Sequence, residues 1–399
     1  MNVAVIGLQF GDEGKGKIVD FMADEFDIIA RFSGGSNAGH TVVYDGKTVK
    51  FHILPSGVLR GKIGVLGNGM VIDLGKLLGE IEMMDALGVH PELHISSRAH
   101  VVSGFHRELD RLDDEIIGIG TTRQGIGPAY TSKFRRIGIR VSDLYNPDTL
   151  EKKLRMLVRL TSLDANDTDI RNEVKVLKDQ GLAIKDYVDD TEIWLNRAID
   201  AGYSVLFEGA QGTYLDIDFG TYPYVTSSNT TVGGIITGLG ISPWRIDEVV
   251  GVTKAYTTRV GAGPFPTEIR DDDAETLRNL GNEYGATTGR ARRVGHLDMC
   301  MLRYAVMING VTSLALTKVD VLYGMESVRV AYAYRCGGRI FRYPPTNIED
   351  CQPEYMVFEG WNSPEDEKLR KFVKYMEKEL GVRVNIISYG PDRHSTRKM

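Results

Sequence analysis

The first twenty residues constrain the fold more than any other part of the chain. Residues 2–6 (NVAVI) form an apolar run that predicts a buried strand, and Ile18, Val19 and Met22 have the spacing of a helix. The glycine-rich segment 7–17 (GLQFGDEGKGK) lies between them. A strand, a glycine-rich turn and a helix in this order are typical of a phosphate-binding loop, because backbone N–H groups and a helix N-terminus favour an anion. A tight structural turn is the alternative interpretation.

The loop matches the phosphate-loop pattern GxxxxGK only in part, over residues 11–17. Lys17 is followed by Ile18, where a Ser or Thr hydroxyl would contact magnesium. Asp12 is the hard oxygen donor within the loop, so we expect its carboxylate to contact the metal instead. An acid beside a bound cation does not repel a phosphate. The same carboxylate could also accept a proton from a second ligand within hydrogen-bond reach.

Apolar, β-rich runs alternate along the chain with segments of helical period. The strand-like runs are residues 3–6, 63–66, 204–207, 249–252 and 313–317, and the helical segments are 74–87, 149–160, 184–201 and 366–380. This alternation predicts an α/β fold with a mostly parallel central sheet flanked by helices, of the phosphate-loop NTPase type.

Smaller features complete the predicted architecture. Residues 44–54 and 328–343 contain glycine turns between alternating runs and predict small antiparallel hairpins. The charged stretch of roughly 105–201 predicts a helical insertion beside the sheet. Because no linker or repeat interrupts the chain, we expect a single large domain over residues 1–399.

Composition excludes several classes of protein. With 42% apolar and 26% charged residues, the 399-residue chain has the balance of a soluble globular protein. A net charge of -6 without a dense Lys/Arg block argues against nucleic acid as a partner. No signal peptide or long apolar run is present, which predicts a cytoplasmic protein without membrane contact. Cys300, Cys336 and Cys351 are widely spaced, so we expect inert thiols in a reducing compartment, without disulfides or a zinc site.

Glycines are concentrated in loops that follow the predicted strands. These loops are residues 33–41, 118–128, 208–212, 261–264 and 285–293. In a doubly wound sheet such loops meet at the carboxyl ends of the strands, where ligands bind. Several polar, glycine-rich loops therefore predict one large composite site.

Long sequence matches in these loops carry a family resemblance. The segments are 34–41 (GGSNAGHT), 207–213 (FEGAQGT), 220–231 (GTYPYVTSSNTT), 260–267 (VGAGPFPT), 285–290 (GATTGR), 317–320 (TKVD) and 388–393 (SYGPDR). With the first loop they make the chain resemble the adenylosuccinate synthetase family from end to end. The resemblance implies GTP-dependent ligation of IMP and L-aspartate to adenylosuccinate in AMP biosynthesis. It also implies release of GDP and phosphate through a 6-phosphoryl-IMP intermediate, with Mg²⁺ as cofactor.

The resemblance also implies roles for individual residues. Asp12 corresponds to the general base that takes the N1 proton of IMP, and His40 to the acid near the γ-phosphate. Imidazole suits that role because its unperturbed pKa lies near neutrality. Gln211 is the third catalytic residue, with an amide that fits the 6-oxygen. The magnesium would be held by Asp12 and the backbone carbonyl of Gly39.

The resemblance implies three groups of ligand contacts. GTP contacts are implied at Asp12, Glu13, Gly14, Lys15, Gly16, Lys17, Gly39, His40, Thr41, Arg292, Lys318, Asp320, Ser388 and Gly390. IMP contacts are implied at Asp12, Lys15, Asn37, Ala38, Gly39, His40, Thr122, Arg136, Gln211, Thr226 and Arg290. L-aspartate contacts are implied at Thr287, Thr288 and Arg290.

Two of these assignments have consequences for specificity and assembly. Asp320 would follow a strand, and its carboxylate can accept from both N1–H and the 2-amino group of guanine, whereas adenine has no N1–H. This predicts GTP rather than ATP as the phosphoryl donor. Arg136 corresponds to an arginine that reaches the neighbouring subunit's IMP site, which implies a homodimer.

Some positions depart from the family pattern, and other functions remain open at this stage. Ser36 and His296 stand where relatives carry His and Trp, and Ala291 replaces a residue that is often basic or proline. We expect these departures to tune activity without removing it. A GTPase switch and a non-catalytic nucleotide-binding regulator are the alternatives. The many ligand groups beyond those that GTP needs argue against the switch, and the presence of Asp12 and His40 argues against the regulator.

Overall fold

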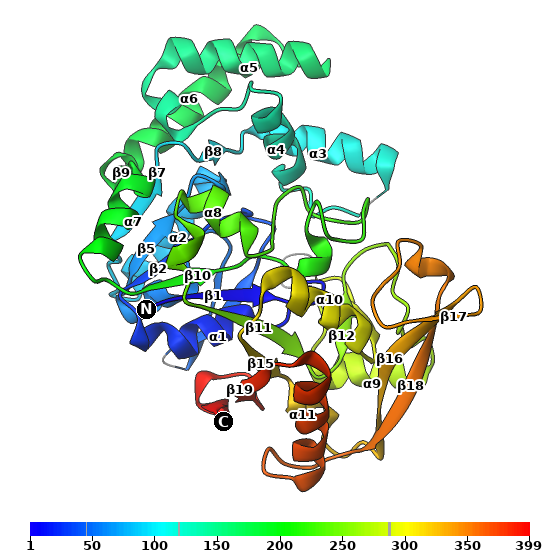
Figure 1. The fold of residues 1–399 in the computed structure, drawn as a ribbon. Coiled ribbons are helices and arrows are strands. Elements are labelled where there is room, and N and C mark those ends of the chain that lie inside the picture. Colours follow the sequence, from blue (N-terminus) through cyan, green and yellow to red (C-terminus); the bar gives the residue numbers. More distant parts are fainter. Residues whose placement is uncertain (45, 119, 286–288) are drawn as a thin grey trace.

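The computed structural model describes residues 1–44, 46–118, 120–285 and 289–399. Within these ranges a ten-stranded sheet runs through the molecule in the order β20-β19-β15-β11-β1-β10-β2-β5-β7-β9 (Figure 1). Its strands are β1 (Asn2–Gly7), β2 (Ile28–Arg31), β5 (Ile63–Leu66), β7 (Leu93–Ser96), β9 (Val188–Asp189), β10 (Val205–Glu208), β11 (Glu248–Lys254), β15 (Ser313–Thr317), β19 (Arg383–Ser388) and β20 (Thr396–Lys398). The β19–β20 pair is antiparallel and the other neighbours in this sheet are parallel. The predicted mostly parallel α/β sheet is confirmed.

Strand β1 lies at the centre of the sheet and is buried on both faces. Its alternate side chains point to opposite sides, as the pleat of a strand requires. Ala4 and Ile6 belong to one hydrophobic cluster, whereas Val3 and Val5 pack with residues of α1 (Lys15–Met22) in another. This double burial explains the continuous apolar run at the start of the sequence. It also fixes α1, and with it the glycine-rich loop, against the sheet.

Helices cover the sheet and extend beyond it. Besides α1, they are α2 (Leu74–Ala86), α3 (Gly104–Ile117), α4 (Ile126–Phe134), α5 (Pro147–Thr161), α6 (Asp167–Ala183), α7 (Thr191–Asp200), α8 (Gly233–Leu239), α9 (Asp272–Gly281), α10 (Met299–Asn309) and α11 (Glu367–Leu380). The predicted helices at 74–87, 149–160 and 366–380 are confirmed as α2, α5 and α11. Helices α3 to α7 fall within the stretch predicted as a helical insertion, and Figure 1 shows α3 to α6 gathered at one end of the molecule. The assignment to one domain stays a prediction.

The predicted helix over 184–201 is wrong in its first part. Residues Lys185–Tyr187 form a 3-10 turn, and β9 follows it before α7 begins at Thr191. Val188 pairs with Ile95 of β7 in parallel register, so backbone hydrogen bonding to the sheet replaces the helix at this point. The local pattern of apolar residues could not distinguish the two.

Both predicted hairpins are present. Strands β3 (His40–Tyr44) and β4 (Lys47–Phe51) pair antiparallel, starting four residues earlier than predicted. Strand β16 (Ser327–Cys336) pairs with β17 (Arg339–Phe341), and also with β18 (Gln352–Glu359).

The cysteine prediction is wrong for two of the three residues. Cys336 and Cys351 form a disulfide, and Cys300 is free and buried. The β16–β18 register pairs Arg335 with Gln352, which brings the neighbouring cysteines together although they are 15 residues apart in sequence. Among the described residues, no helix has the length and hydrophobicity needed to cross a membrane.

Candidate active site

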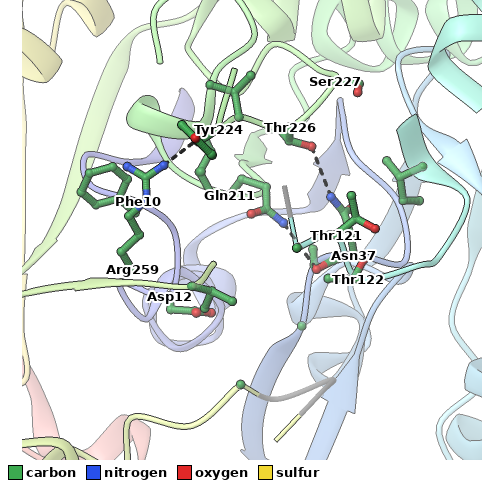
Figure 2. Close-up of a pocket in the computed structure, with 18 of the residues that line it drawn as sticks. Phe10, Asp12, Asn37, Thr121, Thr122, Gln211, Tyr224, Thr226, Ser227 and Arg259 are labelled. Atoms are coloured by element: carbon green, nitrogen blue, oxygen red, sulfur yellow. Dashed lines mark hydrogen bonds between the residues drawn. The ribbon is translucent and has the colours of Figure 1, made fainter. Parts of the chain in front are cut away.

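Loops from several strands enclose a cavity of about 510 Å³ at the carboxyl ends of the sheet. Its lining includes residues from each of the predicted glycine-rich loops. Figure 2 shows part of this lining. Of the residues predicted as ligand contacts, the cavity is lined by Asp12, Gly14, Lys15, Gly16, Lys17, Asn37, Ala38, Gly39, His40, Thr41, Thr122, Gln211, Thr226, Arg292 and Lys318. The sequence segments that carry the resemblance therefore meet in space.

The two adjacent acids of the first loop face in different directions. Glu13 is fully buried, and its carboxylate accepts hydrogen bonds from the backbone N–H groups of Gln9 and Gly11, each at 3.0 Å. Lys15 donates to the same carboxylate at 2.5 Å. A Cβ on Gly7 would lie 2.5 Å from this carboxylate, so the approach requires glycine there. Glu13 thus stabilises the loop from within and does not face the cavity.

Asp12 instead lines the cavity, with a side chain that is 33% exposed. Its backbone has φ of 58°, a left-handed conformation that is costly for a non-glycine residue and is found at functional sites. Its carboxylate forms an ion pair with Arg292, whose Nε lies 2.8 Å from Oδ2. The Asp12 carboxylate is therefore placed to contact a cation or a proton donor inside the cavity.

His40 is the first residue of β3 and is buried against the loop. A Cβ on Gly16 would lie only 2.9 Å from the Cβ of His40. The His40 Nδ1 atom is hydrogen-bonded to Glu208, and Glu208 also accepts from the backbone N–H of Ser56 at 2.8 Å and from its hydroxyl at 2.7 Å. Since Nδ1 is occupied, Nε2 is the nitrogen left for a ligand.

Burial and the neighbouring charges act in opposite directions on the pKa of His40. Burial lowers the pKa of His40, and the Glu208 carboxylate offsets part of that effect. Burial also opposes ionisation of Glu208, but the charges of His40 and Arg31 outweigh it and hold the pKa of Glu208 below its usual value. Sequence reasoning missed Glu208, although an acid at the end of an otherwise apolar strand was the available signal.

A second group of polar side chains lies across the cavity. Gln211 donates through Nε2 to the backbone oxygen of Asn37 at 3.4 Å, and Asn37 donates to the Thr226 hydroxyl at 3.3 Å (Figure 2). A Cβ on Gly11 would lie 3.5 Å from Oε1 of Gln211, so the first loop and Gln211 are in contact. Asp12 and this amide group can therefore reach one small ligand.

A third group lies where β15 and β19 run side by side. Lys17 donates to the Ser388 hydroxyl and to the backbone oxygen of Gly390, and burial lowers the pKa of Lys17 to about 8. Burial raises the pKa of Asp320, whose buried Oδ1 has no hydrogen-bond partner in the described part of the chain. An unpaired buried acceptor is costly unless a ligand supplies the donor. Lys15 and Lys17, both predicted to face phosphate, contact protein atoms in this structure.

The remaining predicted residues lie outside the cavity lining or outside the described residues. Arg136 lies in a separate surface depression together with His100, Lys133, Arg140 and Lys153. Arg290 is exposed, and a Cβ on Gly120 would lie 3.7 Å from its Nη1. Thr287 and Thr288 are not among the described residues.

The structure shows the environment of two residues that depart from the family pattern, Ser36 and His296. Ser36 is fully buried, and its hydroxyl has no hydrogen-bond partner among the described residues. His296 packs edge-on against Tyr355 with ring centres 5.2 Å apart, and burial lowers the pKa of His296 to about 4. Nothing in the structure explains Ala291.

Fold and site together define a class of protein. An α/β enzyme that uses a nucleoside triphosphate typically has a glycine-rich loop after the central strand, a carboxylate that faces the cavity and a histidine held by a second carboxylate. Comparison with known proteins identifies the family. The family model described as adenylosuccinate synthetase matches residues 4–397.

Relatives and solved structures agree with that match. Adenylosuccinate synthetase of Thermodesulfovibrio yellowstonii is 46% identical, with 98% of this chain and 97% of the relative covered. That of Thermoplasma volcanium is also 46% identical, with 98% and 96% covered. The structure of fully ligated adenylosuccinate synthetase from Plasmodium falciparum has a TM-score of 0.94 at 38% identity, covering 100% of this chain and 99% of that one. A cyanophage succinoaminodeoxyadenylate synthetase shares the fold, with a TM-score of 0.68 at 22% identity over 100% of this chain and 95% of that one.

The chain belongs to the adenylosuccinate synthetase family. It is a GTP-dependent ligase of purine nucleotide biosynthesis, acting on the route to AMP. The ligase interpretation of the sequence is confirmed, and it takes the place of the GTPase switch and the regulator.

Proposed function

We propose that this chain joins IMP and L-aspartate in two steps within the cavity, with Asp12 as the general base. In the first step Asp12 accepts the N1 proton of IMP, and the 6-oxygen takes the γ-phosphoryl group of GTP, releasing GDP. In the second step the amino group of L-aspartate attacks C6, and phosphate leaves with the 6-oxygen. The observation that carries the proposal is the Asp12 carboxylate, which lines the cavity beside the loop–Gln211 contact.

His40 acts as the acid toward the transferred phosphoryl group. Its Nδ1 is held by Glu208, so Nε2 is available to donate to the developing charge on phosphate. Donation from Nε2 requires the imidazolium form, which burial opposes. The Glu208 carboxylate on one side and an incoming phosphate on the other both favour that form. Gln211 acts as a hydrogen-bond donor to the 6-oxygen.

The residues present fit a magnesium ion at Asp12 and Gly39. Both line the cavity, and the ion pair with Arg292 indicates that Asp12 is matched to a positive charge. The described residues contain no cluster of three or more His, Cys, Asp or Glu side chains that could hold a metal. Mg²⁺ usually binds through one or two carboxylates together with substrate phosphates, and Asp12 offers one such carboxylate in the cavity. When bound, Mg²⁺ neutralises charge on the triphosphate.

The unpaired Asp320 supports GTP as the donor. Its buried Oδ1 lacks a hydrogen-bond partner among the described residues, and guanine offers N1–H and the 2-amino group to fill that position. Lys17, which contacts Ser388 and Gly390, is also close enough to Asp320 for their charges to interact. We therefore assign the guanine ring to the ends of β15 and β19, and the triphosphate to the first loop. L-aspartate is assigned to Arg290 and to Thr287 and Thr288.

A homodimer is part of the proposal, with Arg136 serving the IMP site of the neighbouring subunit. Arg136 does not line the cavity of its own chain and lies in a depression with three other cationic side chains. Phe134, beside it, is 75% exposed. Cytoplasmic location also stays a proposal, and the disulfide removes the thiol argument for it.

The substitution Asp12→Asn tests the assignment of the base. We expect GDP still to bind and IMP-dependent turnover to fall by at least about 100-fold, because the amide cannot accept the proton. Phosphate release in the presence of GTP, IMP and L-aspartate measures turnover. Asp148→Asn, on the exposed start of α5, is the matched control and should behave as wild type. Near-normal turnover of Asp12→Asn would remove the assigned base.

A further inference from the structure

One buried carboxylate outside the predicted site gathers three cationic side chains. Glu283 follows α9 and is fully buried. Its Oε2 accepts from Nη1 of Arg292 at 2.6 Å. Its Oε1 accepts from Nζ of Lys318 at 2.9 Å, from Nζ of Lys254 at 3.3 Å and from the Tyr256 hydroxyl at 2.5 Å.

The four donors come from different parts of the fold. Lys254 ends β11 and Tyr256 follows it, Lys318 follows β15, and Arg292 precedes β13 (Arg293–Gly295). Further bonds fix the arrangement: Arg292 donates from its backbone to the Glu283 backbone oxygen at 2.9 Å, and Lys318 donates to the Gly281 oxygen at 2.6 Å. Glu283 therefore joins the loops that carry two predicted GTP contacts.

The charge balance of this cluster depends on Glu283. Lys254, Lys318 and Arg292 contribute three positive charges, and Glu283 and Asp12 contribute two negative ones, leaving a net charge of +1. Burial opposes ionisation of Glu283, but the three cations hold its pKa well below the usual value. Burial lowers the pKa of Lys254 to about 8. Removing the Glu283 charge would leave three buried or half-buried cations facing Asp12 alone.

The cluster also connects the two ends of the proposed nucleotide site. Ion pairs run from Asp12 through Arg292 and Glu283 to Lys318, two residues before Asp320. Arg292 bridges two carboxylates through different nitrogens, because its Nε pairs with Asp12 and its Nη1 pairs with Glu283. Without Glu283, Arg292 would keep only the ion pair with Asp12, and its guanidinium group would no longer be held from two sides.

We propose that Glu283 is a positioning residue for the donor nucleotide, whose buried carboxylate holds Arg292 and Lys318 in place for GTP. The proposal rests on the GTP contacts assigned above to Arg292 and Lys318. Glu283 itself does not line the cavity, so it acts through these two side chains.

Glu283→Gln tests the proposal, because it keeps the shape and removes the charge. We expect the Kd for a fluorescent GDP analogue and the KM for GTP to rise by about tenfold or more, since a buried charge pair loses one partner. The KM for IMP at saturating GTP should stay within about twofold, because the change acts at the donor side. A purely structural role would weaken all three substrates alike.

A second substitution provides a rescue. Lys254 is fully buried, does not line the cavity and contacts Glu283. Glu283→Gln raises the net charge of the cluster from +1 to +2, and Lys254→Met in the same chain returns it to +1. We expect the double variant to recover at least about threefold of the lost GDP affinity. No recovery, or a folded Glu283→Gln protein with GDP affinity within about twofold of wild type, would overturn the proposal.

If the Glu283→Gln protein does not fold, Tyr256→Phe tests the same proposal. It removes one donor to Glu283 and leaves every charge in place. We expect a rise of about threefold in the GDP Kd with the IMP KM unchanged, and an unaltered GDP Kd would overturn the proposal. Failure of the GTP assignment itself would be visible separately, as a wild-type protein that does not bind GDP.

Discussion

His40 and Glu208 are hydrogen-bonded side chain to side chain although they lie 168 residues apart in the sequence. The contact joins the start of β3 to the end of β10, and Ser56 donates one hydrogen bond to each oxygen of the Glu208 carboxylate. The proposed acid is therefore oriented by a buried group that does not line the cavity.

Glu208→Gln should lower kcat by about 100-fold, with KM values for the three substrates within about threefold of wild type. The amide keeps the shape but no longer favours the imidazolium form of His40. Steady-state phosphate release measures both quantities. Ser56→Ala, which removes one of the two Ser56 donors and no charge, should have a much smaller effect on kcat. Equal losses in the two variants would show that charge at Glu208 is not what His40 requires.

Gly7→Ala should disrupt the first loop. The added Cβ would lie 2.5 Å from the Glu13 carboxylate and 2.6 Å from the Gln211 backbone oxygen. We expect a loss of about 1–3 kcal/mol in the free energy of unfolding, from overpacking, together with weaker GDP binding. Urea unfolding and GDP titration measure the two effects.

Gly79→Ala is the matched control for that substitution. Gly79 lies within α2, and a Cβ there would meet nothing within 4 Å. Alanine should stabilise the helix by up to about 1 kcal/mol and leave GDP binding unchanged. A Gly7→Ala protein with wild-type stability and affinity would contradict the close approach of Glu13.

Reduction of the Cys336–Cys351 disulfide should destabilise the protein. The bond closes a loop of 15 residues, for which the chain-entropy model gives about 3 kcal/mol. Thermal unfolding with and without a thiol reductant measures the difference, and Cys336→Ala with Cys351→Ala should reproduce the reduced state. Unreduced, denatured protein should show one reactive thiol, that of Cys300. Three thiols per chain would restore the interpretation drawn from cysteine spacing.

Mild acid should destabilise the start of α3 through His106. Burial lowers the pKa of His106 to about 4, and its Nδ1 accepts from the Ser103 backbone N–H at 3.0 Å, which requires the neutral imidazole. Since the unfolded chain binds the proton near pH 6.5, stability is complete above that pH and is lost as pH falls toward 4. At pH 5 the loss from this residue is about 2 kcal/mol.

His106→Gln isolates that contribution. A glutamine at this helix position can accept from the Ser103 N–H as in an ordinary capping box, and it does not titrate. The free energy of unfolding of the variant should therefore change less between pH 7.5 and pH 5 than that of wild type. An identical pH dependence in both proteins would assign the acid sensitivity to other groups.

Apolar runs predicted β1, β5, β10, β11 and β15 but missed other strands, including β2, which lies inside the sheet between β10 and β5. Strands β1 and β10 are buried on both faces, so their sequences are almost entirely apolar. Strands β7 and β19 were missed because polar residues interrupt them, and β2 was missed because its apolar run is only three residues long. Arg31 ends β2 and is fully buried, and it donates hydrogen bonds to the backbone oxygens of His52 and Ile53. These contacts could not be predicted from the local sequence pattern.

In the candidate site, too, the sequence predicted some features and missed others. Motifs identified Asp12, His40 and Gln211, which the structure brings to one cavity. The sequence could not tell that Glu13 turns inward while Asp12 faces the cavity, because the two acids are neighbours and their orientation depends on Gly7 and the backbone around it. The pairing of Glu208 with His40, 168 residues away, and the four donors gathered on Glu283 become visible only in the folded structure.

The contact of Lys17 with Ser388 and Gly390 has a consequence for biosynthesis. These partners are added to the growing polypeptide more than 370 residues after Lys17, since Ser388 lies 371 positions further on. A ribosome therefore delivers the two sides of the proposed nucleotide site at opposite ends of translation, and a prematurely terminated chain lacks the side that contains Ser388 and Gly390.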